Sequence, residues 1–207
     1  MAGCWRRSRA ADAMSAEDSV IALFPLHAVL FPGGPLPLRI FETRYTDMVR
    51  RCLREQQPFG VVLIQEGEEA GPVATTATIG CSARIADFHT MQDGLLGISC
   101  VGERKFGVQR VWRAADGLNM GEVSWLAAEP LLPVPPDYAR LGDAVRTAMD
   151  ELAEHYQHVD KRFDDAAWVG GRLTELLPIE LNDKQVLLEL DDPLARLAAL
   201  LELVPGK

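Results

Sequence analysis

The sequence lacks the features that mark membrane and secreted proteins. No apolar run reaches the ~18 residues that a membrane helix needs, and no apolar export-signal region follows the basic start of the chain. The four cysteines, Cys4, Cys52, Cys81 and Cys100, stand far apart without a C-x-x-C pair, a pattern typical of reduced thiols. We therefore expect a cytoplasmic protein that does not enter membranes, with residues 1–18 as a disordered leader.

Motifs for common catalytic devices are also missing. The chain contains no G-x-x-x-x-G-K-[ST] phosphate loop, no G-x-G-x-x-G after a strand, no G-x-S-x-G elbow and no S-x-x-K. A cysteine hydrolase would need Cys81 or Cys100 close to His89, which lies in a neighbouring candidate strand. Free cysteine is among the most buried residue types, so we favour a structural role for both thiols.

The segment HYQHVD places His155, His158 and Asp160 near one face of a predicted helix, a spacing suited to metal ligands. The further ligands that a metal site requires are not evident in the sequence. Two solvent-facing histidines on an acidic helix need no functional explanation. We expect no catalytic residue, no metal and no cofactor, and hence a protein that is not an enzyme.

Basic residues are too few and too scattered for a typical nucleic-acid binder. The net charge is −9, and residues 129–207 carry most of it, with 8 basic and 16 acidic residues. An acidic half opposes binding to phosphate backbones. A local RNA-binding patch could form only from Arg104, Lys105, Arg110 and Arg113.

Residues 20–127 consist of short apolar runs separated by turn residues, and this pattern predicts strands. The expected strands are 20–26, 35–40, 59–65, 78–90, 94–102, 105–112 and 119–127. Asp93-Gly94 and Asp116-Gly117 are hairpin signals, because tight turns favour residues that tolerate positive φ. One helix interrupts the strands, since Tyr45, Met48, Val49, Cys52 and Leu53 recur at helical spacing before Pro58.

Proline-rich residues 129–137, EPLLPVPPD, predict an extended linker, after which the apolar period becomes helical. The stripe from Tyr138 to Val159 predicts one long helix, and 165–178 predicts a second that contains Gly170-Gly171. Asn182 and Gln185 have the spacing of a capping box before a third helix at 183–190. Asp192 followed by a proline predicts the start of a fourth.

These elements predict an α+β fold with two parts. Strands joined by hairpins and packed on one helix favour a partly closed barrel, because closure removes exposed sheet edges. We assign residues 19–128 to the barrel, 129–137 to the linker and 138–207 to a helical bundle.

The segment FPLHAVLFPGGPLPLRIFETRY, residues 24–45, combines four prolines with a double glycine. Phe31 to Pro35 predicts a turn between the first two strands, because glycine adopts the backbone angles that proline cannot. The charged residues that follow it have the chemistry to bind a ligand, but we favour helix-start capping and ion pairing as their role. The candidate binding residues are Pro32, Gly33, Gly34, Arg39, Glu42 and Arg44.

This segment closely resembles the start of the Lon protease N-terminal substrate-binding domain family, and further pieces follow in the same order. They are FGVVLI, TIGCSARIADFHTMQDGLLGISCVGERKFGV and LPIELNDKQVLLELDDPLARLAALLELV. The resemblance covers residues 20–204 and implies a PUA-like β pseudobarrel followed by an α-helical bundle. It also implies recognition of unfolded or tagged proteins, and we expect a stand-alone domain without the ATPase and protease modules.

We therefore favour a non-catalytic module that binds client proteins or a protein partner, acting as an adaptor or regulator in protein quality control. The alternative is a PUA-like RNA-binding module, although we regard nucleic acid as an unlikely partner on charge. Because ligands favour concave junctions between subdomains, we place the binding surface where barrel meets bundle or beside the turn at 31–35.

Overall fold

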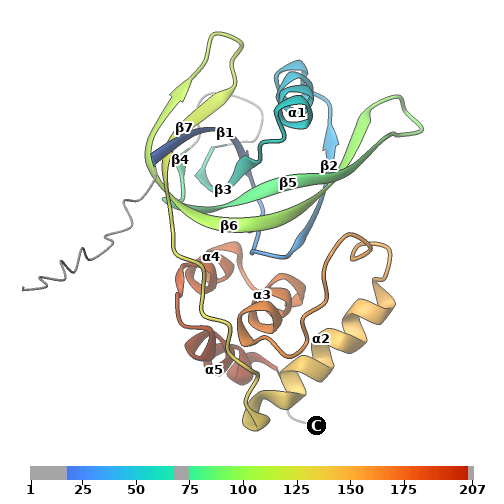
Figure 1. Ribbon diagram of the computed structural model, residues 1–207, viewed down its shortest axis with the longest axis vertical. Coiled ribbons are helices and arrows are strands. Elements are labelled where there is room, and N and C mark those ends of the chain that lie inside the picture. Colours follow the sequence, from blue (N-terminus) through green and yellow to red (C-terminus); the bar gives the residue numbers. More distant parts are fainter. Residues whose placement is uncertain (1–17, 68–74, 205–207) are drawn as a thin grey trace, which may run out of the picture.

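The computed structural model describes residues 18–67 and 75–204, so the predicted leader up to position 17 lies outside the described residues. It has an α+β architecture in which a sheet stands above a group of helices (Figure 1). The strands are β1 (Asp18–Leu26), β2 (Pro35–Ile40), β3 (Phe59–Glu66), β4 (Thr75–Thr76), β5 (Ile79–Thr90), β6 (Leu96–Arg113) and β7 (Asn119–Trp125), with helix α1 (Thr43–Glu55) between β2 and β3. We call residues 18–125 the sheet part.

The remaining elements follow an irregular connector of residues 126–135. They are a 3-10 helix (Pro136–Tyr138), α2 (Ala139–Glu151), α3 (Ala166–Leu176), α4 (Leu181–Glu189) and α5 (Pro193–Leu203). We call residues 136–204 the helical part. None of the helices within the described ranges is long and apolar enough to span a bilayer.

The sheet closes on itself. Its strands follow the order β1-β7-β6-β5-β3-β4, and β1 also pairs in parallel with β3, from Leu23 opposite Gly60 to Leu26 opposite Leu63. Five strands therefore form a ring, which leaves few edges exposed. α1 packs its Tyr45, Met48 and Val49 into a core cluster with sheet residues that include Phe24 and Val61.

The predicted strands 94–102 and 105–112 are wrong in one respect, because they form the single strand β6. Cys81 pairs with Lys105 and Ala83 pairs with Gly102, so two residues of β6 lie opposite one residue of β5. This bulge shifts the alternation of side chains along β6. It explains why Arg104 is exposed although a regular strand would place it on the face of buried Phe106.

Both predicted hairpins are confirmed. Gly94 and Gly117 have φ values of 83° and 81°, and they follow Asp93 and Asp116 at the tips of the β5–β6 and β6–β7 turns. Each aspartate accepts a hydrogen bond from the backbone N–H two residues later, at 3.1 Å and 3.0 Å.

The helical part differs from the prediction at two helices. α2 ends at Glu151 rather than Val159, and tight turns follow that bring Tyr156 and Val159 back into the core. A straight helix would carry these side chains away from that core, at about 1.5 Å per residue. Asn182 does not cap α4, which begins at Leu181 after Glu180.

Gln185, expected to complete the capping box, instead donates to the carbonyl of Ile79 in β5 at 2.9 Å. It docks α4 onto the sheet part. The prediction for α5 is confirmed, since the Asp192 side chain accepts from Leu194 N at 2.9 Å.

A buried group of charges joins the two parts. Lys105 of β6 donates to the carbonyls of Leu188 and Leu190, both at 3.1 Å, and pairs with Glu129 of the connector at 3.0 Å. Arg196 of α5 holds the same carboxylate with two hydrogen bonds of 2.7 Å. Lys105 and Arg196 are only 4% and 1% exposed, so Glu129 is their main buried counter-charge.

We expect Glu129→Gln to lower the free energy of unfolding by about 3–5 kcal/mol, because it leaves two buried cations without that counter-charge. Urea denaturation measures the change. Asp47→Asn, which removes the exposed Asp47–Arg50 pair, is the matched control and should cost at most about 1 kcal/mol. Equal effects of the two substitutions would contradict this role for Glu129.

Candidate functional site

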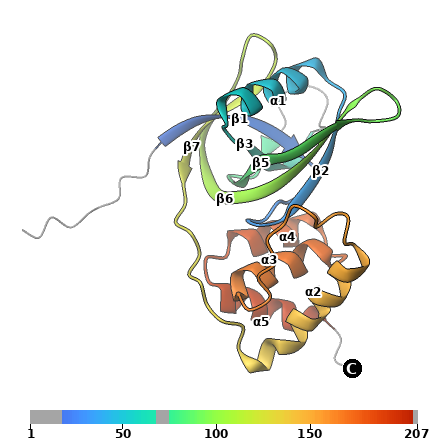
Figure 2. The same ribbon diagram turned by 45° about the vertical axis from the view of Figure 1, so that its right-hand side comes forward.

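A cleft of about 380 Å³ opens where the sheet part meets the helical part. Four segments far apart in the sequence form most of its walls: residues 31–33, residues 101–105 of β6, residues 126–131 of the connector, and residues 158–168 before and within α3. Arg84 of β5 and Arg196 of α5 complete the lining. Figure 2 shows the same junction from a second side, with the β1–β2 connection reaching down toward α3 and α4. A cleft of this size lies within the range of small-ligand sites.

The cleft exists because two strands leave the same edge of β6. β2 pairs with β6 only up to Val101, and β7 pairs with it only from Phe106 onward. β5 occupies the opposite edge throughout this region. Between the two pairings, the chain before β2 and the chain after β7 diverge and leave the cleft between them.

The double-glycine turn docks onto the helical part. Gly34 N donates to Phe31 O at 3.0 Å, and Gly33 has a φ of 72°, which confirms the predicted turn. The turn is not part of a hairpin, because β1 pairs with β7 and β3 whereas β2 pairs with β6. Arg172 of α3 instead donates to the carbonyl of Pro32 at 3.1 Å.

Arg172 is fully buried and forms a two-pronged pair with Glu175, with N–O distances of 2.8 Å and 2.9 Å. Glu175 also accepts a hydrogen bond from Phe31 N at 3.2 Å. Burial raises the pKa of the Glu175 carboxyl, and the adjacent guanidinium opposes that shift. The glycine turn thus contacts a charged pair of the same chain.

The six candidate binding residues do not form one site. Pro32 and Gly33 line the cleft, and Gly34 is buried against Arg172 and Glu175. The other three lie near α1, away from the junction, and make ion pairs or hydrogen bonds with neighbouring residues. These three are Arg39, Glu42 and Arg44. The Arg39 side chain pairs with Asp93. Glu42 pairs with Arg44 at 2.8 Å, and Arg44 also donates to Gly117 O at 3.0 Å.

Arg39 and Glu42 line a second hollow of about 270 Å³ between the end of β1, β2 and α1. Glu42 is the residue before α1, but its side chain makes no cap hydrogen bond. Ion pairing, rather than capping, therefore accounts for its position.

Sequence analysis did not identify the buried arginines at the junction, Arg172 and Arg196. Arg172 follows Val169 by three positions, and Arg196 follows Pro193 by three and precedes Leu200 by four. Both arginines thus lie on the apolar face of a helix, which is the signal that could have identified them as buried and paired.

The basic patch considered for RNA loses one of its four residues. Lys105 is buried within the junction, as described above. The guanidinium carbons of Arg104 and Arg110 lie 5.1 Å and 5.3 Å from the ring centroids of Trp125 and Trp112, respectively.

The histidine segment and the thiols do not form catalytic or metal sites. His155 is exposed, and His158 Nε2 lies 3.8 Å from Asp87 Oδ2 of β5. The described part of the chain contains no cluster of three or more His, Cys, Asp or Glu that could hold a metal. Cys81 and Cys100 are 1% and 2% exposed, whereas His89 is exposed near the β5–β6 hairpin.

We expect Gly34→Ala to lower the free energy of unfolding by about 1–3 kcal/mol, because an added methyl group would overlap the Arg172–Glu175 pair. Thermal or urea denaturation measures the loss. Gly107→Ala is the matched control, since its methyl group would meet nothing nearer than 4.0 Å. A neutral Gly34→Ala would mean that the pair moves aside easily.

Thiol alkylation gives a second test. Burial raises the pKa of Cys100 to about 12 and that of Cys81 further still, so both thiols stay protonated at pH 8. We expect iodoacetamide at pH 8 to leave both unmodified in the folded protein and to modify both in urea. Peptide mass spectrometry resolves the sites, and rapid modification of either native thiol would contradict its structural role.

Comparisons with known proteins agree with this architecture. A family model described as the ATP-dependent protease La (LON) substrate-binding domain matches residues 20–205. The crystal structure of a Lon N-terminal domain protein from Xanthomonas campestris is 38% identical, with a TM-score of 0.74, and covers 90% of this chain and 99% of that one.

Two curated relatives are longer proteins. Lon protease 2 from Myxococcus xanthus is 27% identical over 91% of this chain, which spans 24% of that protein. Protein cereblon from Danio rerio is 31% identical over 58% of this chain, which spans 28% of it. The chain therefore spans about a quarter of the length of these relatives, and by its family match it belongs to the Lon substrate-binding domain family.

Proposed function

We propose that this protein binds exposed segments of other proteins and presents them without acting on them chemically. The observation that carries the proposal is the match of residues 20–205 to a substrate-binding domain. The cleft at the junction of the two parts supports it, because it offers apolar and charged groups on a concave surface.

In this proposal the closed sheet is a PUA-like pseudobarrel at residues 19–128, and 138–207 is the helical bundle. Closure of the sheet through β1 and β3 supports the first assignment. The protein acts in the cytoplasm as an adaptor or regulator in protein quality control, and its partners are unfolded client proteins or a protein partner.

The burial of Lys105 and the negative net charge favour protein clients over RNA. Lys105 is buried, and the chain carries a net charge of −9. A surface that binds RNA through phosphates needs exposed cations that displace counterions. Two of the cations that remain exposed on β6, Arg104 and Arg110, lie over the rings of Trp125 and Trp112.

The proposal is tested by fluorescence anisotropy with a labelled, reduced and carboxymethylated model protein, its folded form, and a structured RNA, at two salt concentrations. We expect saturable binding to the unfolded form, weak binding to the folded form, and none to RNA. Salt-sensitive binding to RNA without binding to the unfolded protein would replace the proposal with the RNA alternative.

A further inference from the structure

We propose that two copies of this chain associate by pairing the open edge of β5 with itself, antiparallel and centred on Phe88. This inference goes beyond the proposed function, because it assigns a partner to a surface outside the junction cleft. Three properties of residues 87–90 support it: an unpaired strand edge, an exposed aromatic ring, and an order of charged residues that complements itself when two copies meet.

One edge of β5 is open over the second half of the strand. β6 pairs with one edge along the length of β5, whereas among the described strands β3 pairs with the other edge only from Cys81 to Ala83. In both Figure 1 and Figure 2 the β5–β6 hairpin extends beyond the rest of the sheet. Residues 87–90 are all exposed. An open strand edge is a template for pairing with another chain.

Two other edge strands have features that oppose such pairing. β2 contains Pro35 and Pro37, which have no N–H to donate, and β4 is only two residues long. Residues 85–90 of β5 contain neither proline nor lysine. A register shift between Ile85 and Asp87 confines regular pairing to residues 87–90, so the ladder between two copies is short.

The backbone groups of Phe88 face the open edge. Met91 N donates to Leu95 O at 2.8 Å at the end of the hairpin, and hydrogen-bonded pairs alternate along an antiparallel ladder. The amides of Asp87 and His89 therefore point at β6, and the amide of Phe88 points away from it. Phe88 N donates to Asp87 Oδ1 at 2.8 Å, as expected for an amide on an open edge.

Pairing around Phe88 sets an acidic residue opposite a basic one. When two copies of β5 run antiparallel with Phe88 opposite Phe88, Asp87 of each copy lies opposite the partner's His89. These are non-hydrogen-bonded pairs, in which the side chains approach most closely. The carboxylate accepts a hydrogen bond from the imidazole, and two-fold symmetry makes this contact twice.

The neighbouring registers lack this complementarity. Centring the pairing on His89 would place two imidazoles opposite each other, and Phe88 opposite Thr90. Centring it on Asp87 would place two carboxylates opposite each other, and like charges directly opposite are destabilising. The order Asp-Phe-His therefore selects the register around Phe88.

Phe88 supplies the apolar contact on the other face of the strand. Its side chain is 56% exposed, and its cross-strand neighbour on β6 is Ile98, which belongs to the core. In the dimer the two Phe88 rings meet across the symmetry axis and extend this core to the partner. Aromatic pairs across neighbouring strands stabilise a sheet.

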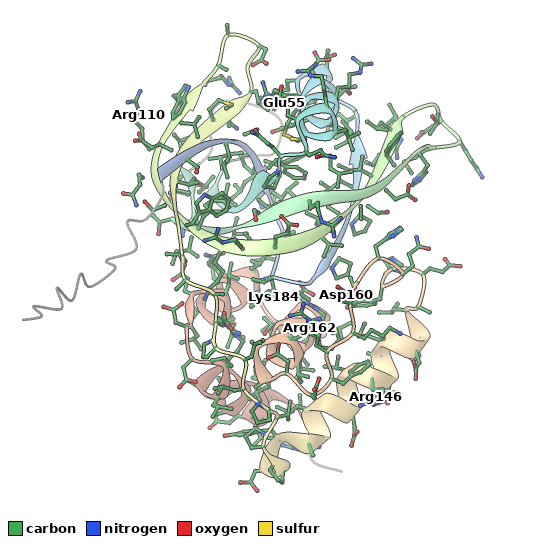
Figure 3. All side chains as sticks on the ribbon, in the orientation of Figure 1. Glu55, Arg110, Arg146, Asp160, Arg162 and Lys184 are labelled. Carbon is green, nitrogen blue, oxygen red and sulfur yellow. The ribbon has the colours of Figure 1, made fainter. Side chains whose placement is uncertain are left out.

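The face that carries Asp87 and His89 already has neighbours. His158 Nε2 lies 3.8 Å from Asp87 Oδ2, and a Cβ added at Gly97 would come within 2.6 Å of His89 Nε2. Figure 3 shows Asp160, which follows this histidine by two positions, where the segment after α2 approaches the sheet part. Asp87 and His89 are both exposed, so the His89 ring can rotate toward the partner without uncovering a core.

Sedimentation velocity of the full chain measures the association. Between about 1 and 300 µM protein we expect a monomer–dimer equilibrium, because a short ladder makes a weak interface. Phe88→Lys should weaken dimerisation by at least about ten-fold, because lysine on a strand edge opposes pairing. Phe41→Lys is the matched control, since Phe41 is 63% exposed and lies outside β5, and it should dimerise like the unsubstituted chain. Circular dichroism verifies folding, and Phe88→Ser replaces Phe88→Lys if that variant unfolds.

Exchange of the two charged residues tests their pairing. Asp87→His places two histidines opposite each other and His89→Asp places two carboxylates opposite each other, so each single variant should dimerise about ten-fold more weakly. The double variant Asp87→His/His89→Asp recreates both pairs in reversed order and should return to within about three-fold of the unsubstituted chain. Damage to the fold by either single substitution would not be reversed by combining them.

A cysteine at position 88 tests the register. Phe88→Cys should form an intermolecular disulfide with diamide, because Cα atoms of a hydrogen-bonded pair lie about 5.5 Å apart, within the range that a disulfide spans. Thr90→Cys is the control, since position 90 lies opposite position 86 of the partner and should not cross-link. Both variants are made with Cys4→Ser, because the other three cysteines are buried. Non-reducing electrophoresis resolves the product.

The proposal fails if the chain remains monomeric up to about 300 µM. It also fails if Phe88→Lys leaves the association intact, or if position 90 cross-links as fast as position 88. None of these results bears on client binding, which is measured separately by anisotropy.

Discussion

The two parts of this molecule are held together by charges that neither part could bury alone. Lys105 comes from a strand, Glu129 from the connector and Arg196 from the last helix, and their side chains meet in the interior. Removing a cation from water is costly unless a counter-ion and hydrogen-bonding carbonyls replace the water. The connector must therefore follow a defined path, since it carries the carboxylate that both cations share.

A second buried pair fixes the other side of the junction. Arg172 and Glu175 both lie on α3, yet each binds the backbone of the turn before β2. The turn can come this close because Gly34 has no side chain in the space that the pair occupies. Phe31 then packs with the apolar residues of the helical part, although it belongs to the sheet part by sequence. The cleft lies between these two fixed contacts, so its walls are held from both sides.

Periodicity and turn chemistry predicted most elements correctly, because they depend on neighbouring residues. The limits of β2, the two Asp-Gly hairpins and the capped start of α5 are local features of this kind. The errors arise where tertiary contacts override local preference. Gln185 has the position of a capping residue but binds β5 instead, and the chain after Glu151 turns so that Tyr156 rejoins the core.

The candidate site was less accessible to sequence analysis. The six predicted residues were neighbours in one motif, but strand pairing carries Pro32 and Arg39 to different places. The cleft draws its residues from four segments and from Arg84 and Arg196, and nothing local connects Leu131 with Trp168 or Arg162. Only the departure of β2 and β7 from a shared edge brings them together.

Closure of the sheet has a consequence for how the chain folds during synthesis. Among the described strands β1 emerges first from the ribosome, and its partner β7 emerges last, with Leu23 opposite Asn119. Long-range pairing of this kind forms slowly, because the intervening loop must be ordered before the contact forms. β3 can pair with one edge of β1 earlier, but the other edge of this apolar strand stays open until β7 follows. An open apolar strand is the form of chain that chaperones bind and that aggregates if left alone. During synthesis, the domain that we propose binds unfolded segments therefore exposes such a segment of its own.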